Sequence, residues 1–108
     1  MSGTLEKLYA VVKDRQQNPQ EGSYTCYLFD KGIDKILKKV GEECAETIIA
    51  AKNEKNDETV YEIADLIYHL MVMMAQQGID IQEVLDELEQ RSAKIGNLKT
   101  MRVTDKNT

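Results

Sequence analysis

Apolar residues that recur at three- and four-residue intervals are the feature that most constrains the fold of this chain. In its middle, the members of this stripe are Ile33, Ile36, Leu37, Val40, Cys44, Ile48 and Ala51. This spacing collects side chains on one face of an α-helix, whereas a β-strand requires strict alternation. We therefore predict a long amphipathic helix from about Ile33 to Asn53, with the stripe, Cys44 included, packed in the core.

Two further helices are expected before this one. The first runs from Thr4, a possible cap, to about Gln17. Residues 23–29 are ambiguous, because their β-branched and aromatic side chains also permit a strand. We favour a short helix there, since Ser23 or Thr25 can cap it.

Two more helices are expected after it. Asn56 or Asp57 can cap one of them, and Gly78 supplies a typical helix end. Asp80 and Glu83 have the spacing of a capping box for the next helix. No segment shows trustworthy strand alternation, so the pattern predicts an all-α bundle of four to five helices with short connections.

Length and composition fit one small domain. The chain has 108 residues, of which 42% are hydrophobic and 31% charged. We expect an all-α domain over residues 1–96 and a basic, partly disordered C-terminal tail over residues 97–108. That tail can meet bound phosphate or remain a solvated end. Because a chain of this size buries a modest core alone, a core shared between two subunits is favoured.

Charge and hydropathy exclude several classes of function. The formal net charge of −5 argues against a general nucleic-acid surface. No apolar run approaches the roughly 20 residues that a membrane helix needs. The N-terminus has no basic region followed by an apolar block, so we expect no secretory signal and a cytoplasmic protein.

Two acidic pairs, Glu43 with Glu46 and Glu62 with Asp65, interrupt the predicted core helices. Residues 60–75 are otherwise almost wholly apolar, so their helix has little face left for solvent. A carboxylate that is removed from water must be paired, protonated or bound to a metal. If the two helices pack antiparallel, four carboxylates meet. Such a set suits a hard cation, Mg²⁺ or Mn²⁺, rather than zinc or copper.

The acids of the first helix also have a simpler interpretation. Glu42, Glu43 and Glu46 can form an ordinary solvated face beside Lys38 and Lys39. This alternative is weaker for the second pair, whose helix offers few exposed positions.

The neighbouring basic side chains leave two interpretations open as well. Lys35 and Lys39, one turn apart, can meet phosphates or pair with the nearby acids. His69 is expected to be a hydrogen-bonded core or supporting histidine rather than a metal ligand. Because Mg²⁺ in proteins often takes phosphate oxygens as further ligands, the chemistry indicated is at phosphorus.

These residues together resemble a known family. Glu42-Glu43-x-x-Glu46 followed by Glu62-x-x-Asp65 resembles the metal-binding signature of the MazG-like all-α nucleotide pyrophosphohydrolases. The blocks at residues 19–25, 28–43, 45–46 and 62–70 are similar to phosphoribosyl-ATP pyrophosphohydrolases. That family hydrolyses phosphoribosyl-ATP to phosphoribosyl-AMP and pyrophosphate, the second step of histidine biosynthesis.

The resemblance implies a magnesium-dependent hydrolase with a nucleotide substrate. It places metal ligands at Glu43, Glu46, Glu62 and Asp65, and it makes Glu42 an auxiliary ligand or a base for the attacking water. Positions expected to contact substrate are Ser23, Tyr24, Thr25, Lys35, Lys39, Lys94 and Asn97. It also implies a bundle that is completed by a second subunit, a homodimer. Many members of the family are fused to the cyclohydrolase of the next step; this chain departs from that pattern, so we expect a stand-alone enzyme.

Two other functions remain open at this stage. One is a house-cleaning pyrophosphatase that acts on non-standard or deoxynucleoside triphosphates. The other is a non-catalytic helical dimerisation module whose acids pair with basic residues across the interface.

Overall fold

Five helices make up the described part of the chain. A computed structural model describes residues 3–96 and contains helices only over that range, as the sequence predicts. Their bounds are α1 Thr4–Gln17, α2 Tyr24–Lys31, α3 Ile33–Lys52, α4 Asn56–Gln77 and α5 Ile81–Gly96. The segment that also permitted a strand is therefore a helix. The predicted tail, residues 97–108, lies outside the described residues.

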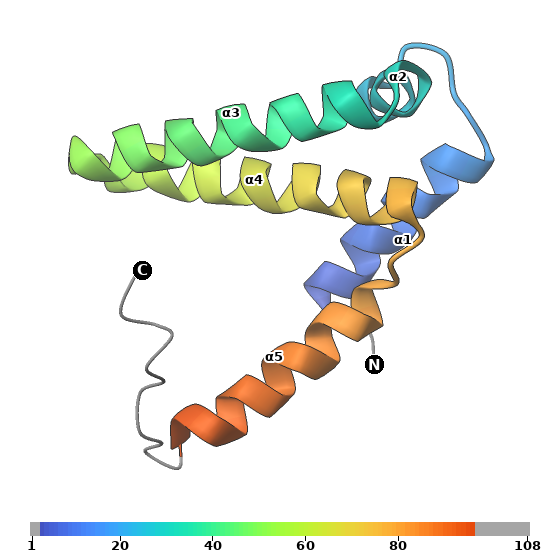
Figure 1. Ribbon diagram of the computed structural model, residues 1–108. Helices are drawn as coiled ribbons and strands as arrows, with labels where there is room; N and C mark the ends of the chain where they lie inside the picture. The colour runs from blue at the N-terminus through green and yellow to red at the C-terminus, as the bar shows by residue number, and fades with distance from the viewer. Residues whose placement is uncertain (1–2, 97–108) are drawn as a thin grey trace.

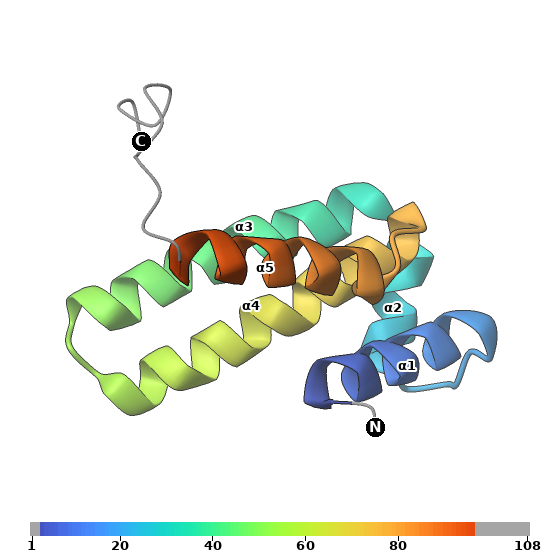
Figure 2. The same cartoon turned by 90° about the horizontal axis from the view of Figure 1, so that it is seen from below.

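Helices α3 and α4 form a long antiparallel pair that organises the molecule (Figure 1). Helices α1 and α2 lie at one end of this pair, and α5 leaves the end of α4 and packs against α1 (Figures 1 and 2). Gly32 joins α2 directly to α3 with φ 92°, a left-handed conformation that glycine adopts without a steric penalty.

Local capping signals were partly right. Ser23 caps α2, since its Oγ accepts a hydrogen bond from the Cys26 N–H at 3.2 Å. The capping box at α5 is confirmed: Asp80 Oδ1 accepts from the Gln82 N–H at 2.8 Å, and Glu83 Oε2 accepts from the Asp80 N–H at 3.0 Å.

The caps predicted for two other helices are wrong by one or two positions. Thr4 lies inside α1, whose cap is Gly3. Helix α4 begins after Lys55, because the carbonyl of that residue already accepts the Thr59 N–H at 2.9 Å. Asn56 therefore lies within the first turn.

The hydrophobic core occupies the end of the bundle where all five helices contribute. It consists of Tyr9, Val12, Leu28, Ile36, Met71, Val72, Met74, Ala75 and Ile81. The methionine-rich stretch of α4 is thus core. A hydrogen bond from the Tyr9 hydroxyl to the Ile79 carbonyl, 2.6 Å long, ties α1 to the chain between α4 and α5.

At the other end, α3 and α4 project as a two-helix arm, residues 44–64, and no other helix of residues 3–96 lies beside it (Figure 1). The prediction that the whole apolar stripe of α3 packs in the core is wrong there: Cys44 is exposed and Ile48 is 68% exposed. Glu43 and Ala50 are buried in their place. In this arm the apolar stripe of α3 is exposed, whereas Glu43, just before the arm begins, is buried against α4.

The arm also corrects the expectation that α4 has little face for solvent. Val60 and Tyr61 are 67% and 70% exposed, because this half of α4 contacts α3 on one side only. Over residues 3–96, no helix is both long and apolar enough to cross a membrane.

Candidate active site

Glu43 lies at the centre of the candidate site. Its side chain is 3% exposed, and its Oε2 atom is buried without a hydrogen-bond partner. Burial, together with the neighbouring carboxylates of Asp65 and Glu46, raises the pKa of Glu43 to about 7. A buried carboxylate with an unpartnered oxygen requires a proton or a cation.

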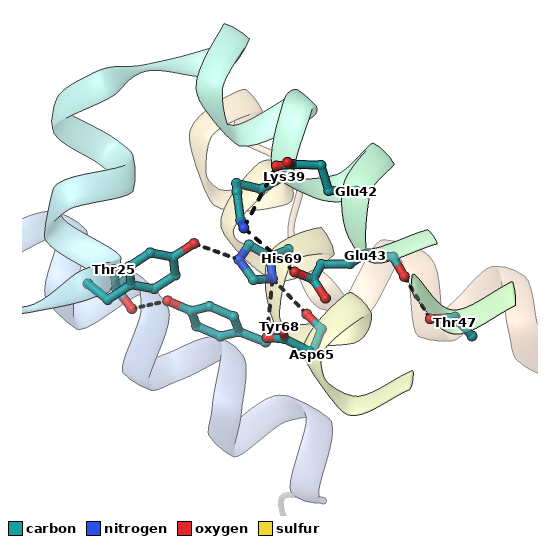
Figure 3. Close-up of polar contacts among 9 residues, drawn as sticks. Thr25, Lys39, Glu42, Glu43, Thr47, Asp65, Tyr68 and His69 are labelled. Carbon is teal, nitrogen blue, oxygen red and sulfur yellow. Dashed lines mark hydrogen bonds and ion pairs between the residues drawn. The ribbon is translucent and has the colours of Figure 1, made fainter. Parts of the chain in front are cut away.

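The other three acids predicted from the sequence gather around this residue. Oxygens of Glu43, Glu46 and Glu62 lie within 4.8 Å of one another, and so do ligand atoms of Glu43, Asp65 and His69. Because Glu43 belongs to both groups, the acidic pair of α3 meets the acidic pair of α4. Figure 3 shows the Glu43 and Asp65 side chains turned toward each other beside the His69 ring.

The order of burial within this carboxylate cluster differs from the sequence expectation. Glu62 and Asp65 are half-buried rather than buried, and Glu46 is exposed. Burial and the nearby Glu46 and Asp65 carboxylates raise the pKa of Glu62. The interpretation of Glu43 as part of a solvated face is wrong, since it faces α4.

Basic residues flank the cluster on α3. Lys39 Nζ lies 3.8 Å from Glu42 Oε1 and 3.7 Å from Glu43 Oε1 (Figure 3). Glu42 is exposed and outside both groups of ligand atoms, so the solvated-face interpretation fits it. Lys35, one turn earlier on α3, is half-buried and forms no ion pair with a described residue.

The first turn of α2 is hydrogen-bonded to α4 next to these acids. The Tyr24 hydroxyl lies 3.0 Å from His69 Nε2, and the Thr25 hydroxyl is hydrogen-bonded to the Tyr68 hydroxyl. Two consecutive residues of α2 thus contact two consecutive residues of α4. Tyr68 was not predicted for the site, and no spacing in the sequence indicates a contact 43 residues away.

The hydroxyl of Tyr24 is within the electrostatic influence of the cluster. Burial raises its pKa; Lys39 opposes this shift, and Asp65 and Glu43 add to it. The same tyrosine also lines an open cavity of about 870 Å³ beside α2, whose wall includes Arg15 and Tyr27. Tyr24 therefore both lines this cavity and contacts His69, which adjoins the carboxylates.

Two other predicted substrate contacts are not brought to the cluster within the described chain. Lys94 is exposed in the last turn of α5, which runs away from the α3–α4 pair (Figure 1). Asn97 lies outside the described residues. Ser23 uses its hydroxyl as a helix cap, which agrees with the simpler of its two interpretations.

The donor set fits a hard divalent cation. Carboxylate oxygens predominate, and the unpartnered Glu43 Oε2 gives a cation a ready ligand. His69 fits less well as a ligand, because both of its ring nitrogens already have partners: the Asp65 carbonyl at 2.8 Å from Nδ1, and Tyr24 at Nε2.

Known proteins match this chain over most of its length. The family model described as phosphoribosyl-ATP pyrophosphohydrolase matches residues 5–92. A phosphoribosyl-ATP pyrophosphatase of Clostridium novyi is 50% identical over 98 residues, which cover 91% of this chain and 89% of that protein. One of Limosilactobacillus fermentum is 55% identical over 95 residues, 88% of this chain and 90% of that protein.

A longer protein is similar as well. The histidine biosynthesis bifunctional protein HisIE of Caldanaerobacter subterraneus is 59% identical over 90 residues, which cover 83% of this chain and 44% of that protein. The chain thus spans less than half of this bifunctional relative and about nine-tenths of the two pyrophosphatases. With the matching family model and the gathered acids, these similarities show that the chain belongs to the phosphoribosyl-ATP pyrophosphohydrolase family.

Proposed function

We propose that this chain hydrolyses phosphoribosyl-ATP to phosphoribosyl-AMP and pyrophosphate, the second step of histidine biosynthesis, in the cytoplasm. The observation that carries the proposal is that Glu43, whose Oε2 is buried without a partner, belongs both to a group with Glu46 and Glu62 and to a group with Asp65 and His69. The family and the relatives' names support phosphoribosyl-ATP as the substrate.

In this proposal, Glu43, Glu46, Glu62 and Asp65 hold Mg²⁺, for which Mn²⁺ can substitute. When bound, the cation neutralises phosphate charge and favours attack of water on the α–β phosphoanhydride. The protein holds the four carboxylates on two packed helices, so little reorganisation is needed on binding. Glu42 flanks the cluster on α3, with its Oε1 3.8 Å from Lys39 Nζ, and is the proposed acceptor of the attacking water's proton.

The substrate's phosphates are assigned to the basic flank of α3. Lys39 and Lys35 act there as point charges, one turn apart on the helix that carries Glu43. Tyr24 and Thr25, at the start of α2, face the substrate beside the cluster, and Ser23 orders that helix start. Lys94 and Asn97 are proposed as further contacts to the substrate's phosphates.

A homodimer is the proposed assembly. The arm exposes Ile48, Ile49, Val60, Tyr61 and Ile63, each at least 43% exposed. Burying a side chain of this kind contributes roughly 1.5–3 kcal/mol, and contiguous exposed apolar patches mark association surfaces. A second copy that covers the arm also explains why the apolar stripe of α3 points outward.

Pyrophosphate release tests the function directly. Purified protein with Mg²⁺ is assayed with phosphoribosyl-ATP beside a panel of nucleoside and deoxynucleoside triphosphates. Turnover of phosphoribosyl-ATP well above the panel is expected, and preferred hydrolysis of a triphosphate would contradict the assignment. Glu62→Ala and Asp65→Ala should abolish turnover while circular dichroism shows unchanged helical content; near-normal activity of both would refute the metal assignment.

A further inference from the structure

The single histidine of the chain is buried directly beneath the carboxylate cluster. His69 is 2% exposed, and its ring nitrogens contact two different helices. Nδ1 lies 2.8 Å from the backbone oxygen of Asp65, and Nε2 lies 3.0 Å from the hydroxyl of Tyr24 on α2. The proposed reaction gives this ring no chemical task.

The partners determine which nitrogen carries the proton in the neutral ring. A carbonyl oxygen only accepts hydrogen bonds, so Nδ1 must carry the hydrogen that it donates to Asp65. Nε2 then has a lone pair, and the Tyr24 hydroxyl donates to it. Both nitrogens are satisfied, as a buried polar ring requires.

The Nδ1–H group also faces the side chain of Asp65. Oδ1 of that carboxylate lies 3.4 Å from Nδ1 (Figure 3). The same N–H therefore lies near both the main-chain and the side-chain oxygen of Asp65. Ligand atoms of His69, Asp65 and Glu43 lie within 4.8 Å of one another, so the ring adjoins the carboxylate pair.

On its other side, the ring fixes a residue of the α2 cavity. Tyr24 packs edge-on against His69, with ring centroids 5.8 Å apart, and it lines the cavity that Arg15 and Tyr27 also border. The Thr25–Tyr68 hydrogen bond joins the same two helices at the neighbouring residues, so it helps to keep Tyr24 next to His69.

We propose that His69 is a positioning residue. Its Nδ1–H orients the Asp65 carboxylate for the cation, and its Nε2 accepts the hydrogen bond of the Tyr24 hydroxyl. Together the two contacts fix the position of the α2 cavity relative to the carboxylate cluster. The inference rests on the proposed function for its substrate, which contacts Tyr24 from the cavity side. Outer partners of metal ligands typically change metal affinity by 10- to 100-fold when they are removed, which sets the size of the expected effect.

Two substitutions separate the two contacts. In His69→Asn the amide nitrogen stands close to the place of Nδ1, so the contact to Asp65 is kept and the contact to Tyr24 is lost. In His69→Gln the amide stands close to the place of Nε2, so the contact to Tyr24 is kept and the contact to Asp65 is lost. Tyr24→Phe removes the same hydrogen bond as His69→Asn from the other side.

Mn²⁺ titration of the substrate-free protein and steady-state kinetics give the test. His69→Gln should weaken Mn²⁺ binding about 10-fold, and His69→Asn should leave it unchanged. His69→Asn should raise KM roughly 3- to 10-fold, the factor expected for one hydrogen bond. Tyr24→Phe should raise KM equally, and the double variant should show no further rise.

Equal losses of Mn²⁺ affinity in the Asn and Gln variants would overturn the proposal, and so would additive effects of His69→Asn and Tyr24→Phe on KM.

If the variants fold poorly, nitrogen-15 NMR of the wild-type protein decides, because one histidine gives one unambiguous pair of ring signals. A protonated Nδ1 is expected, with an Nε2 signal that shifts in Tyr24→Phe. A ring protonated on Nε2 contradicts the inference. Neither the NMR nor the Mn²⁺ measurement uses substrate, so failure of the proposed function would be seen separately, as absence of wild-type turnover.

Discussion

Lys39 Nζ lies 3.7 Å from Oε1 of the buried Glu43, the closest approach of a described lysine or arginine to that acid. Its positive charge has opposite effects on the two proposed ligands of the site, the substrate and the divalent cation. It favours phosphate groups of the substrate, and it repels a divalent cation held by the same carboxylate. Removal of this charge should therefore change the two affinities in opposite directions.

Lys39→Met should raise KM for phosphoribosyl-ATP about fivefold, the effect of roughly 1 kcal/mol from one partly exposed ion pair. It should tighten Mn²⁺ binding to the substrate-free protein. Kinetics and calorimetric titration measure the two quantities. Lys38→Met, which removes an exposed lysine next in sequence, is the matched control and should change neither. Weaker Mn²⁺ binding in Lys39→Met would contradict this account of the charge.

Glu43→Gln should stabilise the metal-free protein while it abolishes catalysis. Folding raises the pKa of Glu43 from its ordinary value of about 4.5 to about 7. A raised pKa means that the group's contribution to stability is complete below about pH 4.5 and is lost as pH rises through about 7. An amide keeps the neutral form at every pH, and the neighbouring Asp65 and Glu46 carboxylates can accept its N–H groups.

Thermal unfolding in the presence of a chelator measures this effect. At pH 5 the melting temperatures of the wild type and Glu43→Gln should nearly coincide. At pH 8 the variant should melt about 5 °C higher, as expected for roughly 1 kcal/mol in a domain of this size. Glu42→Gln, which changes an exposed acid, should show no such pH-dependent difference. A destabilised Glu43→Gln at pH 8 would show that the carboxylate is better compensated than its partnerless Oε2 indicates.

The same pKa predicts proton release on cation binding. Because a carboxylate must be ionised to act as a ligand, Mn²⁺ binding below about pH 7 displaces the proton of Glu43. Calorimetry in buffers with different ionisation enthalpies should detect close to one proton released at pH 6 and far fewer at pH 8. The apparent affinity should fall as pH decreases through this range. Proton release that is the same at pH 6 and pH 8 would assign the ligand role to acids other than Glu43.

Much of the fold could be predicted because its signals are local. The Asp80–Glu83 capping box and the Ser23 cap join residues three positions apart, so they can be read from the sequence. The meeting of the two acidic pairs was also predictable, since a short turn between two amphipathic helices favours antiparallel packing. The short α2 was resolved in favour of a helix by its cap.

The burial of individual site residues could not be predicted in this way. The apolar stripe of α3 indicated which face packs inward, yet Ile48 is exposed and Glu43 is buried. An apolar stripe predicts that a helix face packs against another element, but it does not tell whether that element belongs to the same chain or to a second subunit. The Tyr24–His69 contact spans 45 residues and depends on how α2 sits on α4, which no spacing in the sequence indicates.

The outward stripe leads to a test of the proposed homodimer. Ile48→Lys places a charge among the exposed apolar side chains of the arm, where Ile48 is 68% exposed in the single chain. A charge buried at a subunit interface costs on the order of several kcal/mol, enough to dissociate most dimers. Light scattering should give a dimer mass for the wild type and a monomer mass for the variant.

Val11→Lys, at a 51% exposed position on α1 outside the arm, is the control and should remain dimeric. Wild-type unfolding should also shift to higher temperature with protein concentration, because association stabilises by mass action, and Ile48→Lys should lose this dependence. A wild-type protein that is monomeric at all concentrations would leave the arm's apolar side chains in water and would contradict the proposed assembly.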